Sequence, residues 1–280
     1  MKIVVTGAGG QLGSVFVTQA RAAGLEVQAY SSRECDITQD LQLDLEGVDA
    51  LINCAAYTAV DKAEDEPEKA FAINARGVEN LAQLCKKQRV SMIHISTDYV
   101  FDGAKTEAYV ETDLPHPQNV YGLSKLKGEE ALQRIWEQHI ILRVSWVFSR
   151  FSHNFVKTIL RLSQERPQLK IVMDQIGSPT GATHIAQAIL TMLQHPRLHH
   201  HWGIYHYSDT PLTNWYAFAK HFVDPQQCEI LPITSAEYPL KAKRPLNSAL
   251  NCAKIKRIFG IEQQPWQTEL ALLLHDEYTA

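Results

Sequence analysis

Two residues in the stretch NVYGLSKLKGEE, Tyr121 and Lys125, have the types and the spacing for proton transfer. Residues four apart are neighbours on one face of a helix. A free tyrosine has a pKa near ~10 and exchanges its proton poorly at neutral pH, but a nearby ammonium favours the phenolate and lowers that pKa. The pair could therefore act as a general acid or base. The same spacing also occurs in helices without a catalytic role, so other residues must show whether this pair is catalytic.

A second stretch, HISTDYVFDG, reads as a buried strand that ends in polar residues. Ser96, Thr97 and Asp98 stand at its carboxyl end, which is where parallel sheets bind their ligands. A hydroxyl at that place can hydrogen-bond a carbonyl oxygen that becomes an alkoxide. Polar residues at strand ends also serve only as caps of turns and helices.

A third stretch, VVTGAGGQLG, joins an apolar strand directly to a helix and spaces Gly7, Gly10 and Gly13 three residues apart. Glycines permit a tight turn there and let the backbone approach a pyrophosphate. The N–H groups at the start of the helix, around Gln11 and Leu12, and the positive end of its dipole would bind the phosphates. We therefore predict a dinucleotide site at the same sheet edge as the polar residues above, so that hydride transfer would accompany proton transfer.

The turn after the second strand indicates which dinucleotide is bound. An acidic residue there would hydrogen-bond the ribose 2′-hydroxyl of NAD, whereas this chain has AYSSRECD. Arg33 and the hydroxyls of Ser31 and Ser32 suit a 2′-phosphate, so we expect NADP(H). Asp36 keeps NAD(H) open, and it is assigned with Ile37 to the cofactor site.

Strand-like and helix-like segments alternate through the first half of the chain, which predicts a parallel sheet with crossover helices. The expected strands are Lys2–Thr6, Glu26–Tyr30, Ala50–Cys54, Met92–Ser96, Ile140–Val144 and one near Lys170–Met173. The expected helices are Gln11–Ala23, Glu68–Gln88, Tyr121–Gln138, Asn154–Glu165 and Thr183–Leu193. The fold class is α/β, a Rossmann-like doubly wound parallel sheet with a smaller C-terminal substrate-binding domain. We expect the dinucleotide-binding domain at residues 1–148, completed by about 169–200, and the smaller domain at 149–168 and 201–280.

Composition and charge exclude several classes of protein. A hydrophobic content of 45%, a charged content of 21% and a net charge of −4 are typical of a globular protein and argue against a nucleic-acid partner. The five cysteines include no C-x-x-C pair and indicate neither a disulfide framework nor a zinc site. The run His199–His201 reads as an exposed loop, and we expect no metal. We also expect no signal peptide and no membrane span, and place the protein in the cytoplasm.

Taken together, TGAGGQLG, STDYVFDG and VYGLSKLKGE resemble the extended short-chain dehydrogenase/reductase family. Further strings, among them DQIGSPTGATHIA and RPLNSALNCAKI, resemble its subfamily of dTDP-4-dehydrorhamnose reductases and extend the resemblance over nearly the whole chain. The resemblance implies NADPH-dependent reduction of the C4 keto group of dTDP-4-dehydro-β-L-rhamnose to dTDP-L-rhamnose, the last step of dTDP-rhamnose biosynthesis.

The resemblance also implies roles for individual residues. Thr97, Tyr121 and Lys125 would be the catalytic trio, in which Tyr121 protonates the C4 oxygen and Lys125 holds the cofactor. The backbone positions that would run beside the cofactor are Ala55, Ala56 and Tyr57. The residues that would contact the nucleotide-sugar substrate are Asp98, Tyr99, Trp146, Asn154, Arg244, Asn247 and Ser248.

Two of these substrate residues also have a physical case of their own. Trp146 offers an aromatic face to the C–H bonds and methyl group of a deoxysugar, although it could equally be a core residue. Arg244 offers a planar, permanently charged donor to a diphosphate, and Pro245 stiffens the loop that presents it.

The chain departs from the family in two places. Some members form a dimer around a magnesium ion held by glutamates, but two of those positions are Val15 and Thr183 here, and neither side chain replaces a carboxylate around a hard cation. We therefore expect a monomer or weak homodimer without bridging magnesium.

The segment Ser208–Thr213 is less glycine-rich than in the family, which leaves a reductase or epimerase of another nucleotide-linked 4-keto sugar open. A non-catalytic NADP-binding regulatory subunit is a further alternative, but it would not need the trio.

Overall fold

Six parallel strands form the central sheet of the computed structural model, which describes residues 1–279 and their side chains as far as residue 275. The strands are β1 (Lys2–Thr6), β2 (Glu26–Tyr30), β3 (Ala50–Asn53), β4 (Ser91–Thr97), β5 (His139–Val144) and β10 (Gly203–Tyr207). Their order is β10-β5-β4-β3-β1-β2, and every neighbouring pair is parallel. The five strands predicted before residue 150 are confirmed.

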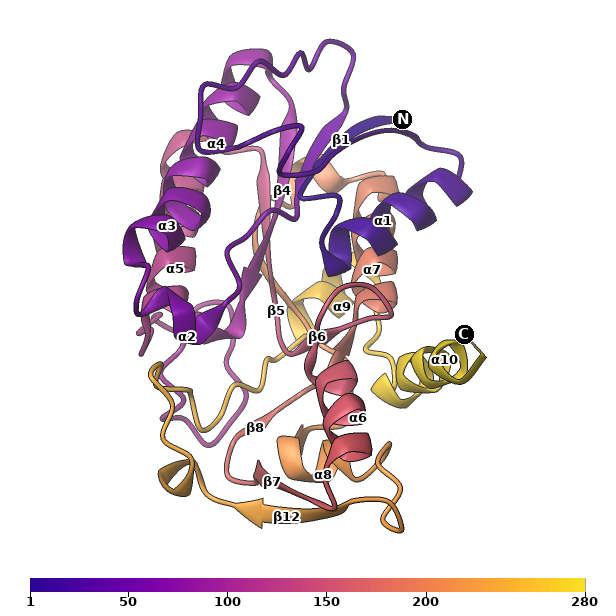
Figure 1. Ribbon diagram of the computed structural model, residues 1–280. Coiled ribbons are helices and arrows are strands. Elements are labelled where there is room, and N and C mark those ends of the chain that lie inside the picture. Colours follow the sequence, from indigo (N-terminus) through magenta and orange to yellow (C-terminus); the bar gives the residue numbers. More distant parts are fainter. Residues whose placement is uncertain (280) are drawn as a thin grey trace.

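Helices cover both faces of this sheet (Figure 1). On one face, α1 (Gln11–Ala22), α7 (Ala182–Gln194) and α9 (Ala253–Phe259) share an apolar cluster with the strands. On the other face, α4 (Gly77–Gln88) and α5 (Val120–Ile135) do the same. Every residue of β5 is buried, as expected for a strand that is covered on both faces. The predicted doubly wound α/β class is confirmed.

The order of the strands reverses beside β1. The chain runs from β1 to β2 on one side and then crosses to β3 on the other, so the carboxyl ends of β1 and β3 border a crevice where such sheets bind ligands. Gly7 after β1 has a φ of 71°, and a Cβ there would lie 2.4 Å from the Ala55 backbone nitrogen. Only glycine fits, and the turns after β1 and β3 therefore lie against each other.

The helix expected at Glu68–Gln88 is present, but it contains a π-turn in its middle. α3 (Pro67–Phe71) is followed by a π-turn at Ala72–Arg76, and α4 begins after it. Asn74 in this turn is buried, accepts from the Tyr57 N–H at 2.8 Å and donates to the Tyr57 carbonyl oxygen at 3.0 Å. Such turns often occur at functional sites, and this one fixes the loop after β3.

A smaller group of elements lies below and to the right of the main sheet in Figure 1. α6 (Phe155–Glu165), α8 (Trp215–Ala219) and α10 (Trp266–Thr279) share an apolar cluster with β7 (Gln168–Val172). β7 pairs in parallel with β12 (Glu229–Ile233), away from the six-stranded sheet. This group forms the second wall of the cleft described below.

One detail of the expected domain division is wrong. The strand near Lys170 was expected to complete the main sheet, but β10 is the sixth strand, and it comes from the segment assigned to the smaller domain. The physical reason is burial, because alternate residues of β7 are exposed and the strand is covered on one face only. The division into two domains otherwise stays a prediction.

Shorter elements connect these layers. They are α2 (Val60–Ala63), the parallel pair β6 (Val147–Phe148) and β9 (Thr180–Gly181), the antiparallel pair β8 (Ile176–Gly177) and β11 (Thr213–Asn214), and 3-10 turns at Asp98–Val100, Leu198–His200 and Ser235–Glu237. The expected helices at α1, α5, α6 and α7 are confirmed to within three residues at each end. Across residues 1–279, no helix has the length and apolar composition that a membrane crossing requires.

Candidate active site

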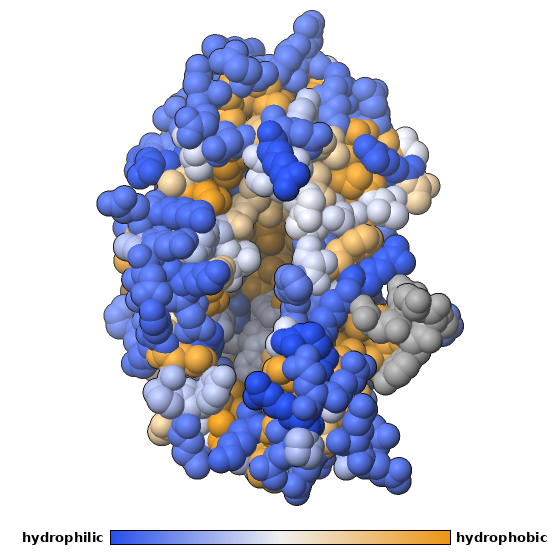
Figure 2. Space-filling view, in the orientation of Figure 1, coloured by the Kyte–Doolittle hydropathy of each residue, from blue (hydrophilic) through white to orange (hydrophobic). Residues whose placement is uncertain are grey.

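A cleft of about 590 Å³ lies between the carboxyl edge of the main sheet and the smaller group of elements. Figure 2 shows a hollow near the middle of this face of the molecule. The walls of the cleft come from the ends of β4 and β5, the start of α5, and β7 and α8. The predicted site residues that line it are Gln11, Thr97, Asp98, Tyr99, Tyr121, Trp146 and Arg244.

The start of α5 places Tyr121 against the end of β4. Asn119 caps the helix, because its Oδ1 accepts from the Gly122 N–H at 2.8 Å. A Cβ on Gly122 would lie 2.2 Å from the Tyr99 carbonyl oxygen, so this close approach requires glycine. The Tyr99 and Tyr121 rings then meet edge to face, with centroids 5.8 Å apart.

Thr97 and Asp98 form a hydrogen-bonded pair at the end of β4. Thr97 Oγ1 accepts from the Tyr99 N–H at 3.2 Å and donates to Asp98 Oδ1 at 3.0 Å, and both side chains are buried. Burial raises the pKa of Asp98 to about 7, although the hydroxyls of Ser248 and Thr97 act to lower it. Near neutral pH the Asp98 carboxyl is therefore present in both its protonated and its ionised form.

Tyr121 keeps its proton at neutral pH. Burial raises the pKa of Tyr121 to about 12, the Thr97 hydroxyl acts to lower it, and Asp98 raises it further. The expected lowering of this pKa by Lys125 is not found in the protein alone, because the loss of water around the phenol outweighs other effects. A protonated tyrosine is the form that a reduction needs, since the new alkoxide must receive a proton.

Lys125 lies one turn further along α5 and is buried. Its Nζ donates to the Ile95 carbonyl oxygen at 2.6 Å and lies 3.4 Å from His94 Nε2. Burial lowers the pKa of Lys125 to about 8, while Glu129 and Cys54 act to raise it. His94 was not identified from the sequence, and only its place in the strand that precedes Thr97 could have drawn attention to it.

The turn after β1 suits the phosphates of a dinucleotide. The N-cap of α1 is Gly10, and no side chain hydrogen-bonds to the N–H groups of the first turn. A Cβ on Gly10 would meet only the Gly7 carbonyl oxygen, at 3.4 Å, whereas one on Gly13 would lie 2.2 Å from that oxygen. Gly13 is thus required for packing, and Gly10 leaves the helix N-terminus accessible to an anion. Of the neighbours, Gln11 lines the cleft and Leu12 belongs to the core.

The turn after β2 carries both cationic and acidic groups. Ser32 and Arg33 are exposed there. The exposed Asp36 carboxylate accepts hydrogen bonds at 3.0 and 2.8 Å from the residue two positions further on. Glu34, which was not considered from the sequence, accepts from the N–H and hydroxyl of Ser31 at 2.8 and 2.7 Å. The preference for a 2′-phosphate therefore stays a prediction that depends on Arg33.

The remaining assigned cofactor residues differ in their surroundings. Ile37 is 3% exposed and its side chain belongs to the core beneath α4, while its assignment to the cofactor site stays a prediction. Ala55 and Ala56 are half-buried in the loop after β3, beside the turn at Gly7. Tyr57 is buried, and its hydroxyl donates to a carboxylate oxygen of Glu66 at 2.9 Å.

Trp146 stands in the wall of the cleft, where its ring stacks on Trp215 with centroids 3.6 Å apart and planes 9° apart. Its backbone has a φ of 46°, which is rare for a large side chain. A Cβ on Gly177 would lie 2.5 Å from the Trp146 ring. The structure thus places Trp146 at the cleft rather than in the core. Trp215 was missed, because the sequence does not show that α8 returns to the cleft.

Arg244 lines the cleft and is paired with a carboxylate of the same chain. Its guanidinium donates two hydrogen bonds to the Asp61 carboxylate, at 2.7 and 3.2 Å, and these hold the pKa of Asp61 below its usual range. Lys170 of β7 brings a further cation to the same cleft. Ser248 is buried beside Asp98.

Asn154 and Asn247 are absent from the described residues that line the cleft. Asn154 caps α6, where its Oδ1 accepts from the Lys157 N–H at 3.1 Å and its Nδ2 donates to the Ser149 carbonyl oxygen at 2.6 Å. Asn247 donates to the Lys105 carbonyl oxygen at 2.8 Å. These amides are used within the protein, and the roles of both residues as substrate contacts stay predictions.

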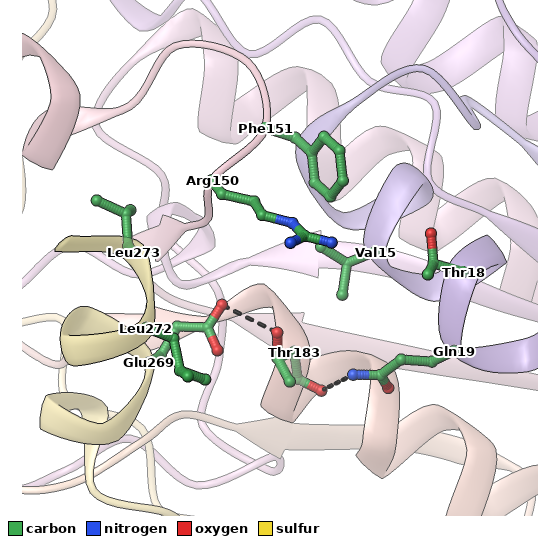
Figure 3. Close-up of a pocket in the computed structure, with 9 residues that line it drawn as sticks. All are labelled: Val15, Thr18, Gln19, Arg150, Phe151, Thr183, Glu269, Leu272 and Leu273. Carbon is green, nitrogen blue, oxygen red and sulfur yellow. Dashed lines mark hydrogen bonds between the residues drawn. The ribbon is translucent and has the colours of Figure 1, made fainter. Parts of the chain in front are cut away.

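A second cavity, of about 260 Å³, lies between α1, α7 and α10 (Figure 3). Val15 and Thr183 both line it, so the two positions that carry glutamates in some family members do meet here. Glu269 lines it too, accepts from the Thr183 hydroxyl at 3.0 Å and is 5% exposed. Within residues 1–279, no group of three or more His, Cys, Asp or Glu side chains is arranged to hold a metal ion.

The fold and the cleft define a nucleotide-dependent oxidoreductase of the short-chain dehydrogenase/reductase class. The family model described as "RmlD substrate binding domain" matches residues 1–279. The chain belongs to this family.

Curated relatives and solved structures agree with that assignment. A dTDP-4-dehydrorhamnose reductase of Aggregatibacter actinomycetemcomitans is 41% identical, over 96% of this chain and 97% of its own. The crystal structure of a dTDP-4-dehydrorhamnose reductase from Clostridium acetobutylicum is 33% identical and covers 100% of both chains with a TM-score of 0.93. That of the enzyme from Bacillus anthracis, in complex with NADP, is 34% identical and covers 98% of this chain and 99% of its own with a TM-score of 0.91.

Proposed function

We propose that this chain catalyses the NADPH-dependent reduction of the C4 keto group of dTDP-4-dehydro-β-L-rhamnose to dTDP-L-rhamnose. The observation that carries the proposal is the meeting of Thr97 and Tyr121 on one wall of the cleft, at the sheet edge that also carries the glycine turn. Membership of the family and the NADP complex of the Bacillus anthracis relative support it.

The nicotinamide, when bound, supplies the hydride, and the residues of the chain supply the proton and the orientation. Tyr121 donates its phenolic proton to the C4 oxygen as negative charge develops there. The Thr97 hydroxyl stands beside Tyr121, and its one proton, which is given to an ionised Asp98, is free for that oxygen when Asp98 is protonated. Lys125 uses one N–H on the Ile95 carbonyl oxygen, which leaves its other donors for the cofactor ribose.

The cleft also suits the two ends of a nucleotide-linked deoxysugar. The stacked rings of Trp146 and Trp215 offer an apolar surface for the sugar. Arg244 and Lys170 bring positive charge for the diphosphate, and Asp61 holds the Arg244 fork in place. In this proposal Arg33 and Ser32 receive the 2′-phosphate, so the Michaelis constant for NADPH is expected to be lower than that for NADH.

The test is the oxidation of NADPH by purified protein in the presence of enzymatically generated dTDP-4-dehydrorhamnose. Tyr121→Phe keeps the ring and removes only the hydroxyl, and it is expected to lower kcat by roughly 10²- to 10⁴-fold. Tyr216→Phe is the matched control, because Tyr216 lies outside the set of residues lining the cleft and its ring contacts Lys220. No turnover by the wild type would refute the substrate assignment, and full activity of Tyr121→Phe would refute the mechanism.

A further inference from the structure

A chain of four buried polar side chains crosses the sheet and ends at Lys125. Thr6, Asn53, His94 and Lys125 are each 2% exposed or less. Thr6 Oγ1 donates to Asn53 Oδ1 at 2.9 Å, Asn53 Nδ2 lies 3.0 Å from His94 Nδ1, and His94 Nε2 lies 3.4 Å from Lys125 Nζ. The first three residues stand on the adjacent strands β1, β3 and β4, so the chain links the sheet interior to α5.

The backbone sets the orientation of the Asn53 amide. The Ala55 N–H, which can only donate, hydrogen-bonds to Asn53 Oδ1 at 3.0 Å. Oδ1 therefore faces Ala55 and Thr6, and Nδ2, which is a donor only, faces His94. His94 Nδ1 must accept this hydrogen bond.

His94 is neutral, because burial holds its pKa well below the usual range and the charges of Lys125 and His139 act in the same direction. A neutral imidazole has one accepting and one donating nitrogen. Since Nδ1 accepts from Asn53, the proton is on Nε2, which is the nitrogen that faces Lys125.

This tautomer distinguishes between the two forms of Lys125. An ammonium has only donors, so it could not accept a hydrogen bond from the Nε2–H of His94 and the two groups would repel. An uncharged amine satisfies both of its contacts, since it accepts from Nε2–H and donates to the Ile95 carbonyl oxygen. The other titratable groups that face Lys125, Glu129 on α5 and Cys54 after β3, favour the ammonium.

We propose that His94 is a positioning residue, which holds Lys125 through Nε2–H and favours the uncharged amine over the ammonium. The catalytic role of this contact between His94 and Lys125 rests on the proposed function. After Tyr121 has given its proton to the substrate, one proton passes from the Lys125 ammonium to the Tyr121 phenolate, and Lys125 regains a proton from water. A lysine that releases its proton readily restores Tyr121 for the next turnover.

The first test measures the tautomer and needs no turnover. Protein labelled with ¹⁵N at its histidines is examined by NMR, and the His94 signals are assigned as those lost in His94→Gln. We expect a protonated Nε2 and an unprotonated Nδ1 throughout the neutral and alkaline range. A protonated Nδ1 with a bare Nε2, or a doubly protonated ring, would overturn the inference. This result is independent of whether the sugar is reduced.

The second test uses two variants of His94, each of which replaces one of the two contacts that the imidazole makes. His94→Gln brings an amide oxygen to Lys125, and His94→Asn keeps an acceptor for Asn53 without reaching Lys125. We expect the alkaline limb of the pH profile of kcat/KM to move upward by about one pH unit, a tenfold change in the protonation equilibrium, in His94→Gln and by less in His94→Asn. The limb is not expected to move in His199→Gln, which changes an exposed histidine. An unmoved limb in a His94→Gln protein with the wild-type Tm would contradict the proposal.

Discussion

At the scale of single residues, burial brings the pKa values of an acid and a base of the site close to each other. Ordinary pKa values of 3.8 for Asp98 and 10.5 for Lys125 become about 7 and about 8, and in each case burial is the largest cause. A buried acid and a buried base are both displaced toward neutrality, because burial disfavours the charged form of each. Both groups therefore change charge within a narrow range of pH around neutrality.

The ionisation of Asp98 predicts how stability depends on pH. The folded protein binds a proton at Asp98 up to about pH 7, whereas the unfolded chain loses it near its ordinary value, so stability falls as pH rises between these values and is level above the folded pKa. Because one pKa unit corresponds to about 1.4 kcal/mol, the ionised carboxylate costs on the order of 4 kcal/mol. Asp98→Asn is expected to remove this fall.

Urea unfolding of wild type and Asp98→Asn at a series of pH values measures the difference directly. Other titrating groups, such as His206 with its lowered pKa, are common to both proteins and cancel in the comparison. Parallel stability curves for the two proteins from pH 4 to pH 8 would show that burial does not raise the pKa of Asp98.

The sequence predicted the types and spacing of the residues on the cleft wall better than it predicted their partners. Thr97 and Tyr121 were expected at one sheet edge, and the structure brings them together, while their catalytic roles stay predictions. Trp215, His94 and Asp61 were not expected, because each acts through a contact that joins segments far apart in the chain. Nothing local in the sequence shows that Asp61 would hold Arg244 across 183 positions.

At the scale of elements, the site depends on how closely α5 approaches its neighbours. A Cβ on Gly122 would lie 2.2 Å from the Tyr99 carbonyl oxygen, and one on Gly128 would lie 2.1 Å from the Asn74 carbonyl oxygen. The two glycines stand almost two turns apart and press α5 against the end of β4 and against the π-turn. The helix that carries Tyr121 and Lys125 is thus fixed at two places.

Gly122→Ala is expected to displace the first turn of α5 and with it Tyr121. Overpacking of this kind costs roughly 1–3 kcal/mol of stability, and a shift of the phenol of about 1 Å can lower activity by about 10²-fold. Thermal unfolding and kcat with NADPH measure the two effects. Leu123→Ala is the control, since Leu123 lies on the exposed side of the same turn. Wild-type kcat in Gly122→Ala would show that the close approach does not position Tyr121.

The elements that the sequence misjudged have local physical explanations. The segment Glu68–Gln88 has a helical pattern throughout, and only the tertiary bond from Asn74 to Tyr57 shows why the helix widens in its middle. β7 was assigned to the wrong sheet, although the alternation of polar and apolar residues is visible in QLKIV once it is compared with the apolar run at residues 140–142 of β5. Strand order is the harder problem, because pairing partners are chosen by packing and not by position in the chain.

At the scale of the whole molecule, the chain carries two cavities of different character. The cleft between the main sheet and the smaller group of elements gathers the polar groups of the proposed reaction. The cavity between α1, α7 and α10 gathers both apolar side chains, such as Leu272 and Leu273, and polar ones, among them Glu269 and the guanidinium of Arg150 (Figure 3). Burial raises the pKa of Glu269, while the Thr183 hydroxyl and His184 act to lower it. Val15 and Thr183 bring no carboxylate beside Glu269, and one carboxylate with a cationic Arg150 in the same lining is a poor oxygen-ligand set for a divalent cation.

We therefore expect the sedimentation coefficient of the wild type to be the same in magnesium and in EDTA. The double change Val15→Glu and Thr183→Glu would place three carboxylates around the second cavity, which is the kind of oxygen-ligand set that magnesium accepts. This variant is expected to lose stability without metal, because like charges meet, and to regain it with magnesium by about 2.7 kcal/mol at a concentration of one hundred times the dissociation constant. Val15→Gln with Thr183→Gln has the same size without the charge and should not respond to magnesium. Magnesium-dependent association of the wild type would instead mean that Glu269 suffices, and that the loss of the other two glutamates does not decide the oligomeric state.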